Sequence, residues 1–235
     1  MDDIAETVYR PPRTISEQIA DACGQMILDG KLKAGQKVVE QSLAEQFSVS
    51  RGPVREALRI LQSRRLVDIV PRKGAHVLPI SLGTIEDLFN TRIALACLAA
   101  RTVAERSESN KFIGLIREKL AIADRLSQDD AVDALEFAFA ANRVVHMITL
   151  GSGNQLVVQI MEELTAQTVW TTIWKTPLDY LTPETRRNRV EQFKTVLKNI
   201  EMGRGDAAEL NLRLALEESR DTALKTLEGR FPVAI

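Results

Sequence analysis

Between residues 40 and 63, apolar residues recur at helical spacing in a stretch that is also rich in arginine. Val54, Leu58 and Leu61 follow one another at intervals of four and three, which is the spacing of a buried helical face. The opposite face carries arginines at intervals of four, namely Arg51, Arg55 and Arg59. We therefore predict a helix with one core face and one arginine face, a form that can lie in the major groove of DNA and pair with guanine edges or phosphates.

The residues just before this helix have the pattern of a shorter helix followed by a tight turn. Leu43, Ala44 and Phe47 give the shorter helix its own apolar stripe. Ser50 is placed to cap the arginine helix through its hydroxyl, and Pro53 falls in the first turn, where a missing backbone N–H costs little. The backbone N–H groups of that first turn form a site suited to a phosphate.

A change to strand-like pattern follows the arginine helix. Residues 66–70 and 75–79 read as two strands, and the residues between them form a basic turn. Gly74 closes that turn and can adopt a positive φ. The pattern predicts a hairpin beside a helix-turn-helix, which is the wing of a winged helix-turn-helix.

Beyond residue 80 the strand pattern stops and long helical patterns take over. The predicted helices lie near 83–107, 110–127, 129–150, 154–175, 182–202 and 206–228. Short punctuating segments separate them, and Asp206 with Glu209 three residues later suggests that Asp206 caps the last helix. Six helices with short connections favour an antiparallel bundle.

The expected fold class is mainly α, with an N-terminal winged helix-turn-helix followed by an all-α antiparallel helical bundle. We expect a mobile tail over residues 1–13, a DNA-binding domain over residues 14–79, and a helical effector-binding and dimerisation domain over residues 80–235.

Charge and composition refine this picture. The formal net charge is only −1, yet residues 46–75 hold seven basic and two acidic residues, so the positive charge forms a patch of the kind that steers binding to phosphate. The longest apolar run, Ile93–Ala100, is too short to span a bilayer, so no membrane is expected as a partner. Cys23 and Cys97 lie in apolar helical stretches without metal-type spacing and read as buried thiols of a reducing compartment. We therefore expect a cytoplasmic protein.

Residues 14–79 resemble the DNA-binding domain of the GntR family of bacterial regulators. The residues that carry the resemblance are Ile27, Gly30, Leu32, Gly35, Glu40, Leu43, Ala44, Val49, Ser50, Arg51, Pro53, Val54, Arg55, Glu56, Ala57, Leu58, Leu61, Leu66, Val67, Arg72, Lys73, Gly74 and Ala75. The resemblance implies a homodimer on a double-stranded DNA operator with an inverted repeat. The residues expected to contact DNA are Gln41, Ser50, Arg51, Pro53, Arg55, Arg59, Arg72, Lys73 and Gly74.

The second half resembles the FadR-type C-terminal domain that follows the wing in one large GntR subfamily, the FCD type. The carriers are Asp87, Leu88, Arg92, Leu95, Asn142, Val145, His146, Ser152, Gly153, Asn154, Gly205, Asp206 and Ala207. This resemblance implies a small effector, often a carboxylate, inside the bundle, and in many members a divalent metal held by Asp-x-x-x-His and two further histidines. The expected effector-binding residues are Arg92, Asn142, His146, Gln192 and Glu217.

The sequence departs from the family's metal pattern. Asn142 stands where the Asp often is, and the two later histidine positions fall on Gln192 and near Glu217. The chain holds only two histidines, His76 and His146, so one subunit cannot supply three. A metal, if present, would rest on His146, Asn142 and Glu217, a set that would bind Zn, Mn or Ni poorly because amides are weak ligands.

Several residues of the bundle keep more than one reading. His146 is a core histidine with a satisfied partner, an effector contact or a metal ligand. Arg92 meets either the carboxylate of an effector or an acid of the bundle itself, because a buried arginine needs an anionic partner. Arg186, Arg187 and Arg189 are expected to form a solvated helix start, although Arg189 could face the cavity.

Two classes of function follow. The first is a sequence-specific transcription regulator, a repressor rather than an activator, whose operator affinity is modulated by a small metabolite, an organic acid, bound in the bundle. The alternative is a metal-dependent sensor or small enzyme that uses the bundle site with an appended DNA-binding domain. The sequence contains no nucleophile elbow, P-loop or Gly-rich dinucleotide loop, so we predict a regulator and not an enzyme.

Overall fold

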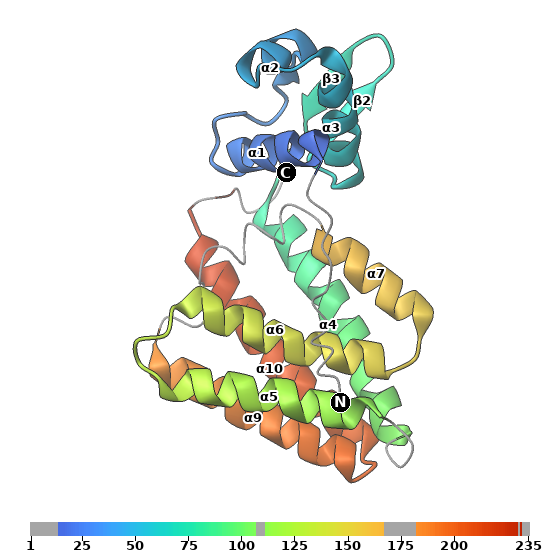
Figure 1. The fold of residues 1–235 in the computed structure, drawn as a ribbon, viewed down its shortest axis with the longest axis vertical. Helices are drawn as coiled ribbons and strands as arrows, with labels where there is room; N and C mark the ends of the chain where they lie inside the picture. The colour runs from blue at the N-terminus through green and yellow to red at the C-terminus, as the bar shows by residue number, and fades with distance from the viewer. Residues whose placement is uncertain (1–13, 107–110, 167–181, 230, 232–235) are drawn as a thin grey trace, which may run out of the picture. The chain divides into compact units, whose positions relative to one another are not determined.

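The computed structural model describes residues 14–106, 111–166, 182–229 and 231, and it divides into two compact units, Met1–Pro79 and Ile80–Ile235. The predicted tail over residues 1–13 and the end of the predicted helix at 154–175 lie outside the described residues. The fold is mainly helical with one small sheet, which confirms the predicted fold class (Figure 1).

The first unit is a winged helix-turn-helix. Its helices are α1 (Ile15–Leu28), α2 (Glu40–Gln46) and α3 (Arg51–Ser63), and its strands are β1 (Lys37–Val38), β2 (Val67–Val70) and β3 (Gly74–Val77). The antiparallel sheet has the order β1-β3-β2, so the predicted hairpin of β2 and β3 is confirmed. The sequence did not predict β1, because two residues are too few to show an alternating pattern.

The core of this unit lies between α1, α3 and the sheet. The predicted core face of α3 is buried, with Val54, Leu58 and Leu61 at most 3% exposed. Ile19 and Cys23 of α1 are also buried, and α1 and α3 pack against each other. Burial of each aliphatic side chain contributes about 1.5–3 kcal/mol, so this contact fixes which face of α3 points outward.

Two predictions about helix starts are wrong in detail. Ser50 is the N-cap of α3, but its hydroxyl does not bond the helix backbone. Its side chain is exposed, so the hydroxyl stays available for another partner. Asp206 is not the N-cap of the last helix, which begins one residue earlier, at Gly205 after Arg204, and Asp206 lies in the first turn instead. A carboxylate there is favoured by the helix dipole, and it also forms an ion pair with Arg101 at 3.2 Å.

The second unit is a helical bundle. Its helices are α4 (Leu82–Glu105), α5 (Phe112–Gln128), α6 (Ala134–Gly151), α7 (Gln155–Ala166), α9 (Pro183–Glu201) and α10 (Gly205–Leu227). The third of these begins at 134 and not at 129, because Asp133 caps it by accepting from the Leu135 N–H. No helix within the described ranges is long and apolar enough to cross a membrane.

Helix α4 is the central element of the bundle. It contacts α6, α7, α9 and α10, while α5 packs against α6 and α9 (Figure 1). Its buried side chains are small over much of its length, including Ala96, Ala99 and Ala100, which lets neighbouring helices approach closely. Residues on several faces of α4 therefore point into the bundle, and Arg92 is one of them.

The capping box of α1 gives a stability prediction. Thr14 accepts from the Glu17 N–H at 3.2 Å, and the Glu17 carboxylate accepts from the Thr14 N–H at 2.7 Å. Thr14→Ala should destabilise the first unit by about 1 kcal/mol, which lowers the melting temperature of a unit of this size by roughly 4–8 °C. Ser50→Ala, the matched N-cap change without a capping bond, should leave it nearly unchanged. Calorimetry of the full-length protein measures both, and equal shifts would contradict the assignment.

Candidate functional sites: an arginine-bearing helix and a cavity in the helical unit

The outward face of α3 carries three exposed arginines, Arg51, Arg55 and Arg59, as predicted from their spacing. Each is held by a neighbouring acceptor. Arg51 donates from Nη2 to Gln41 Oε1 at 2.6 Å, and Arg59 donates to the Glu56 carboxylate at 3.3 Å. The arginines are therefore ordered on the surface while their charge remains accessible to solvent.

Arg55 is held by an acid that sequence reasoning did not assign to the site. Its Nε donates to Glu40 Oε2 at 2.8 Å, across the turn between α2 and α3. Gln41 and Glu40 are adjacent in the first turn of α2, so one short helix holds two arginines of the next. Arg55 and Glu40 are fifteen residues apart, and this separation gives no periodic signal in the sequence.

The wing adds further positive charge to the first unit. Arg72 and Lys73 are exposed in the turn between β2 and β3, where Arg72 has φ of 65° and Gly74 has φ of 93°. A side chain at Gly74 would be strained by this φ, and its Cβ would lie 3.3 Å from Cε of Lys37. Lys37 of β1 thus lies against the wing and is exposed. It joins the predicted basic residues there, although the sequence did not identify it.

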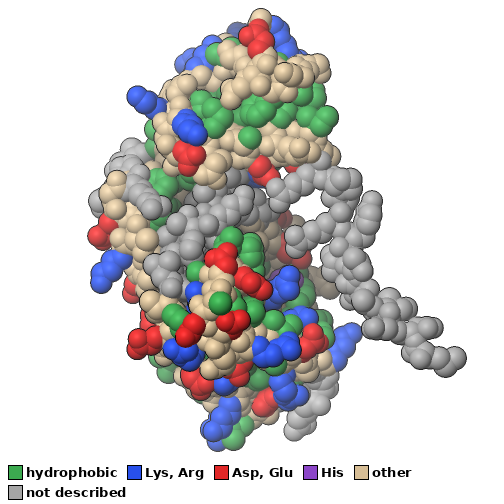
Figure 2. Space-filling view, turned by 60° about the vertical axis from the view of Figure 1, so that its left-hand side comes forward, with side chains coloured by type: hydrophobic (Ala, Val, Ile, Leu, Met, Phe, Trp, Pro, Cys, Tyr) green, Lys and Arg blue, Asp and Glu red, His purple; other side chains and the backbone are tan. Residues whose placement is uncertain are grey.

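These exposed cations have a geometry suited to DNA. A helix with a row of guanidinium groups can present paired N–H donors to base edges, whereas lysines and arginines of a hairpin suit phosphates. Ser50, Pro53 and the N-terminal turn of α3 are accessible beside this row, with Ser50 exposed and Pro53 half-buried. On the face of the molecule in Figure 2, by contrast, Lys and Arg are interspersed with Asp and Glu over the helical unit.

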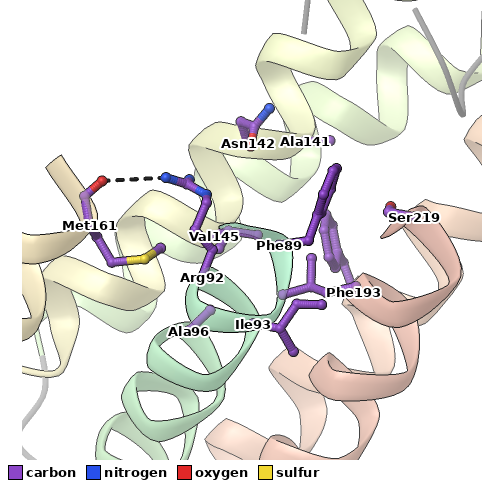
Figure 3. A pocket seen from close by; sticks show the side chains of 11 residues that line it. Phe89, Arg92, Ile93, Ala96, Ala141, Asn142, Val145, Met161, Phe193 and Ser219 are labelled. Carbon is purple, nitrogen blue, oxygen red and sulfur yellow. Dashed lines mark hydrogen bonds between the residues drawn. The ribbon is translucent and has the colours of Figure 1, made fainter. Parts of the chain in front are cut away.

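The second unit contains a cavity of about 40 Å³ between α4, α6, α7, α9 and α10 (Figure 3). At roughly 10–15 Å³ for each water, it has room for about three water molecules. Among the described residues that line it, most are apolar, and the polar ones are Arg92, Asn142 and Ser219. The apolar residues are Phe89, Ile93, Ala96, Ala141, Val145, Met161, Phe193 and Leu216.

Arg92 supplies the positive charge of the cavity. The residue is 9% exposed, and its Nη1 donates to Thr165 Oγ1 at 2.7 Å and to the Met161 carbonyl at 3.4 Å (Figure 3). Burial lowers the pKa of this guanidinium to about 9, so it remains protonated at neutral pH. A buried cation beside an apolar space favours an anionic ligand.

Ser219 connects the cavity to a second buried cation. Its Oγ accepts from Arg189 Nη2 at 2.7 Å, and the other terminal nitrogen of Arg189 donates to the Ala215 carbonyl. Arg189 also lies 6.0 Å from the centre of the Phe193 ring. The predicted solvated helix start is therefore wrong for Arg186, which is 4% exposed. Arg189 is also 4% exposed, which agrees with the alternative of an inward-facing side chain. Arg187 is exposed, as expected.

Only two of the five predicted effector residues, Arg92 and Asn142, line this cavity. Asn142 donates to the Ala138 carbonyl at 3.1 Å. Glu217 instead lines an open groove on α10, because it is two residues from Ser219 and two residues turn a helix by about 200°. Gln192 donates to Glu218 Oε2 at 2.6 Å and is not part of the cavity lining.

His146 lies next to Val145 but is itself exposed and does not line the cavity. Its pKa is lowered from 6.5 by packing around the imidazole and by the charge of Arg92, while Glu162 opposes the shift. Within the described parts of the chain, no three His, Cys, Asp or Glu side chains are grouped so that they could hold a metal. Asn142 lines the cavity, Glu217 lines the groove on α10 and His146 lines neither, so these residues do not fit the metal set that the family pattern implies.

Comparisons with known proteins connect both units to one family. Residues 15–77 match the family model described as "Bacterial regulatory proteins, gntR family", and residues 87–218 match that of the FCD domain. The HTH-type transcriptional regulator BphR of Paraburkholderia xenovorans is 34% identical over 122 residues, which cover 51% of this chain and 50% of BphR. The gluconate operon transcriptional repressor of Bacillus licheniformis is 24% identical over 210 residues, which cover 87% of this chain and 77% of the repressor.

The chain spans half or less of the length of the first curated relatives that it matches. Two solved structures share the fold. One, described as "Lar controls the expression of the Listeria monocytogenes agr system and mediates virulence", has a TM-score of 0.70 at 18% identity and covers 92% of this chain and 99% of its own. The other, E. coli McbR/YncC, has a TM-score of 0.60 at 17% identity and covers 91% of this chain and 99% of its own.

The lowered pKa of His146 predicts a pH dependence of stability. The folded pKa of His146 lies below the 6.5 of an unperturbed histidine. Its contribution to the free energy of unfolding is therefore complete above pH 6.5 and is lost as the pH drops through the folded pKa. His146→Gln should reduce the loss of stability between about pH 7 and pH 5, whereas Glu162→Gln should increase it. Urea unfolding at both pH values measures the difference, and an unchanged pH dependence in both variants would contradict the assigned environment.

Proposed function

Since the chain belongs to the gntR family of bacterial regulatory proteins and carries an FCD domain, we propose that it binds an operator through its winged helix and senses a small organic acid through its helical unit. The matched family and the named relatives are transcription regulators rather than enzymes. The observation that carries the DNA-binding half of the proposal is the exposed row of Arg51, Arg55 and Arg59 on a helix whose other face is core.

In this proposal α3 enters the major groove and the wing contacts the backbone. Arg51 and Arg55 pair with base edges or phosphates, and Ser50 with the first turn of α3 holds a phosphate. Arg72 and Lys73 contact the DNA backbone from the wing. The uncapped, exposed hydroxyl of Ser50 supports this assignment, because it has no competing role in the fold.

We further propose that the protein acts as a homodimer on an inverted repeat. Linking two DNA-binding domains raises the affinity for an inverted repeat, because the second domain binds at a high effective concentration and needs no new contact. Exposed apolar residues on the packed pair α4 and α10 support a surface that a second copy could cover, with Leu98 45% exposed and Leu210 and Leu214 each 55% exposed. The helical unit would then set the distance between the heads.

The DNA-binding proposal predicts distinct effects for two kinds of residue. Selection from random-sequence DNA should yield an inverted repeat, and Arg51→Ala or Arg55→Ala should cost about 1–3 kcal/mol of affinity for it and relax the base preference. Lys73→Ala should weaken all sequences alike and reduce the slope of log K against log salt by about 0.9. Titrations of selected and scrambled duplexes measure both effects. An Arg55→Ala protein with full affinity and selectivity would contradict the placement of α3 in the major groove.

The sensing half of the proposal rests on the cavity of the helical unit. An organic acid would place its carboxylate on Arg92, with the apolar lining around its carbon chain and Asn142 and Ser219 as further polar contacts. A cavity with room for about three water molecules favours a short acid of two to four carbons over a sugar acid. Two of the relatives are named as gluconate operon repressors, and we propose that this protein also represses transcription.

The ligand must act through a difference in affinity between two states. An acid that binds equally well to the two states, which differ in the spacing of the DNA-binding domains, would not shift the equilibrium between them. A tenfold change of operator affinity requires about 1.4 kcal/mol of differential binding. Because α4 contacts every helix that lines the cavity, a ligand that repositions α4 would be felt by the whole unit.

A metal-dependent sensor is the less favoured function for this chain. Of the potential ligands, Asn142 lines the cavity, Glu217 lines the groove on α10 and His146 lines neither, and an amide is a weak ligand for Zn, Mn or Ni. We therefore derive no step through a metal and assign the sensing role to the cavity at Arg92.

Arg92 provides the test of the sensing half. A panel of acetate, lactate, butyrate and gluconate should contain a short acid that raises the melting temperature and changes operator affinity about tenfold. Arg92→Ala should abolish that response while operator binding persists, and Arg92→Lys should weaken it because the planar fork is lost. Arg143→Ala, which removes an exposed cation of α6, is the matched control and should respond normally. An Arg92→Ala protein that still responds would show that the cavity is not the sensing site.

A further inference from the structure

The first turn of α2 holds two of the three arginines of α3, Arg51 and Arg55, through acceptors of different charge. Arg51 is held by the neutral amide of Gln41 at 2.6 Å, and that amide donates in turn to Glu45 Oε1 at 3.1 Å. Arg55 is held by the carboxylate of Glu40 at 2.8 Å. Arg51 therefore keeps its charge undiminished by its direct partner, whereas the charge of Arg55 is offset by its direct partner.

The contact with Glu40 also determines which edge of the Arg55 guanidinium is free to pair with another partner. Glu40 accepts from Nε, so the edge formed by Nε and Nη2 is no longer free to make two parallel hydrogen bonds to a base. Within the described residues, the terminal nitrogens Nη1 and Nη2 of Arg55 make no hydrogen bond to the protein. Two parallel N–H groups are what the O6 and N7 acceptors of guanine require. The contact with Glu40 thus leaves the edge of Arg55 formed by Nη1 and Nη2 available to pair end-on with a base.

This ion pair has little value for the stability of the fold. The side chains of Arg55 and Glu40 are 62% and 37% exposed, and exposed pairs contribute about 0–1 kcal/mol. The contact can matter more on DNA, where the carboxylate faces the phosphates. A fixed negative charge beside Arg55 penalises a purely charge-driven contact with phosphate, while a base edge that meets both Nη groups retains its hydrogen bonds.

We propose that Glu40 is a specificity-determining residue that acts through Arg55: it holds the guanidinium end-on for a base edge and disfavours its use as a phosphate clamp. The inference rests on the proposed function, in which α3 reads the operator. It assigns base discrimination to Arg55 and the larger share of charge-driven affinity to Arg51, on the basis of the acceptors that α2 supplies to each.

The test compares full-length variants by parallel selection from random-sequence DNA, followed by titration of the selected and a scrambled duplex at several salt concentrations. Glu40→Ala should relax preference at the same base pairs that Arg55→Ala relaxes. Its affinity for the scrambled duplex should rise, roughly two- to fivefold, because a repelling charge is removed. Arg55→Ala should lower that affinity instead, so the two variants share one effect and differ in the other.

Two further variants separate charge from geometry. Glu40→Gln keeps an oxygen that can accept from Nε but removes the charge, so it should raise affinity for the scrambled duplex and retain part of the base preference. Glu56→Gln is the charge-matched control, because Glu56 pairs with Arg59 and not with Arg55. It should also raise affinity for the scrambled duplex, yet leave the base pairs read by Arg55 unchanged.

The outcomes distinguish the inference from the proposed function. If the wild-type protein selects no sequence, the proposed function fails and the inference fails with it. If the wild type selects a site and Glu40→Ala selects the same site with the same preference, the inference alone is overturned. A Glu40→Ala protein that loses preference, scrambled-duplex affinity and melting temperature together would show that Glu40 only supports the fold.

Discussion

The packing of α3 against α1 is the contact on which the rest of the first unit depends. Because Val54, Leu58 and Leu61 are buried at intervals of four and three, the rotation of α3 about its axis is fixed. The arginines at intervals of four then have only the outward face left to them. The β2–β3 hairpin, whose strand β2 packs against α3, carries the exposed cations of the wing. The packing of the core thus determines which side chains are exposed on the opposite face of α3.

The helical unit uses the same logic in a different way. Its central helix, α4, is surrounded by other helices, so even a charged residue on it is directed inward. Thr165 and the Met161 carbonyl accept hydrogen bonds from Arg92 there, which lowers the cost of burying it. Arg189 is held in the same manner by Ser219 and the Ala215 carbonyl. Both cations use helix backbone and hydroxyl groups of neighbouring helices, which makes the polar part of this core specific to one register of packing.

The sequence predicted what is periodic or punctuated and missed what depends on register between distant elements. The faces of α3 followed from spacing, and the wing followed from the turn that ends at Gly74, whose positive φ is observed. The burial of Arg186 was missed, because charged residues near a helix start are usually solvated, whereas an inward-facing Arg189 was kept as an alternative. Glu217 was placed with the cavity although the neighbouring turn directs Ser219 there instead. No local pattern links Glu40 to Arg55, since the turn between two helices brings them together.

Helix α2 has only seven residues, from Glu40 to Gln46, and its inward anchors are Leu43 and Ala44. Its first turn carries the acceptors for both Arg51 and Arg55, so the two arginines share a single support. A small shift of α2 on the core would therefore re-aim both at once. Exchanges of one aliphatic side chain for another at the buried position 43 can thus alter the readout of DNA. Substitutions in the interior of the domain and changes in its DNA sequence preference are therefore coupled.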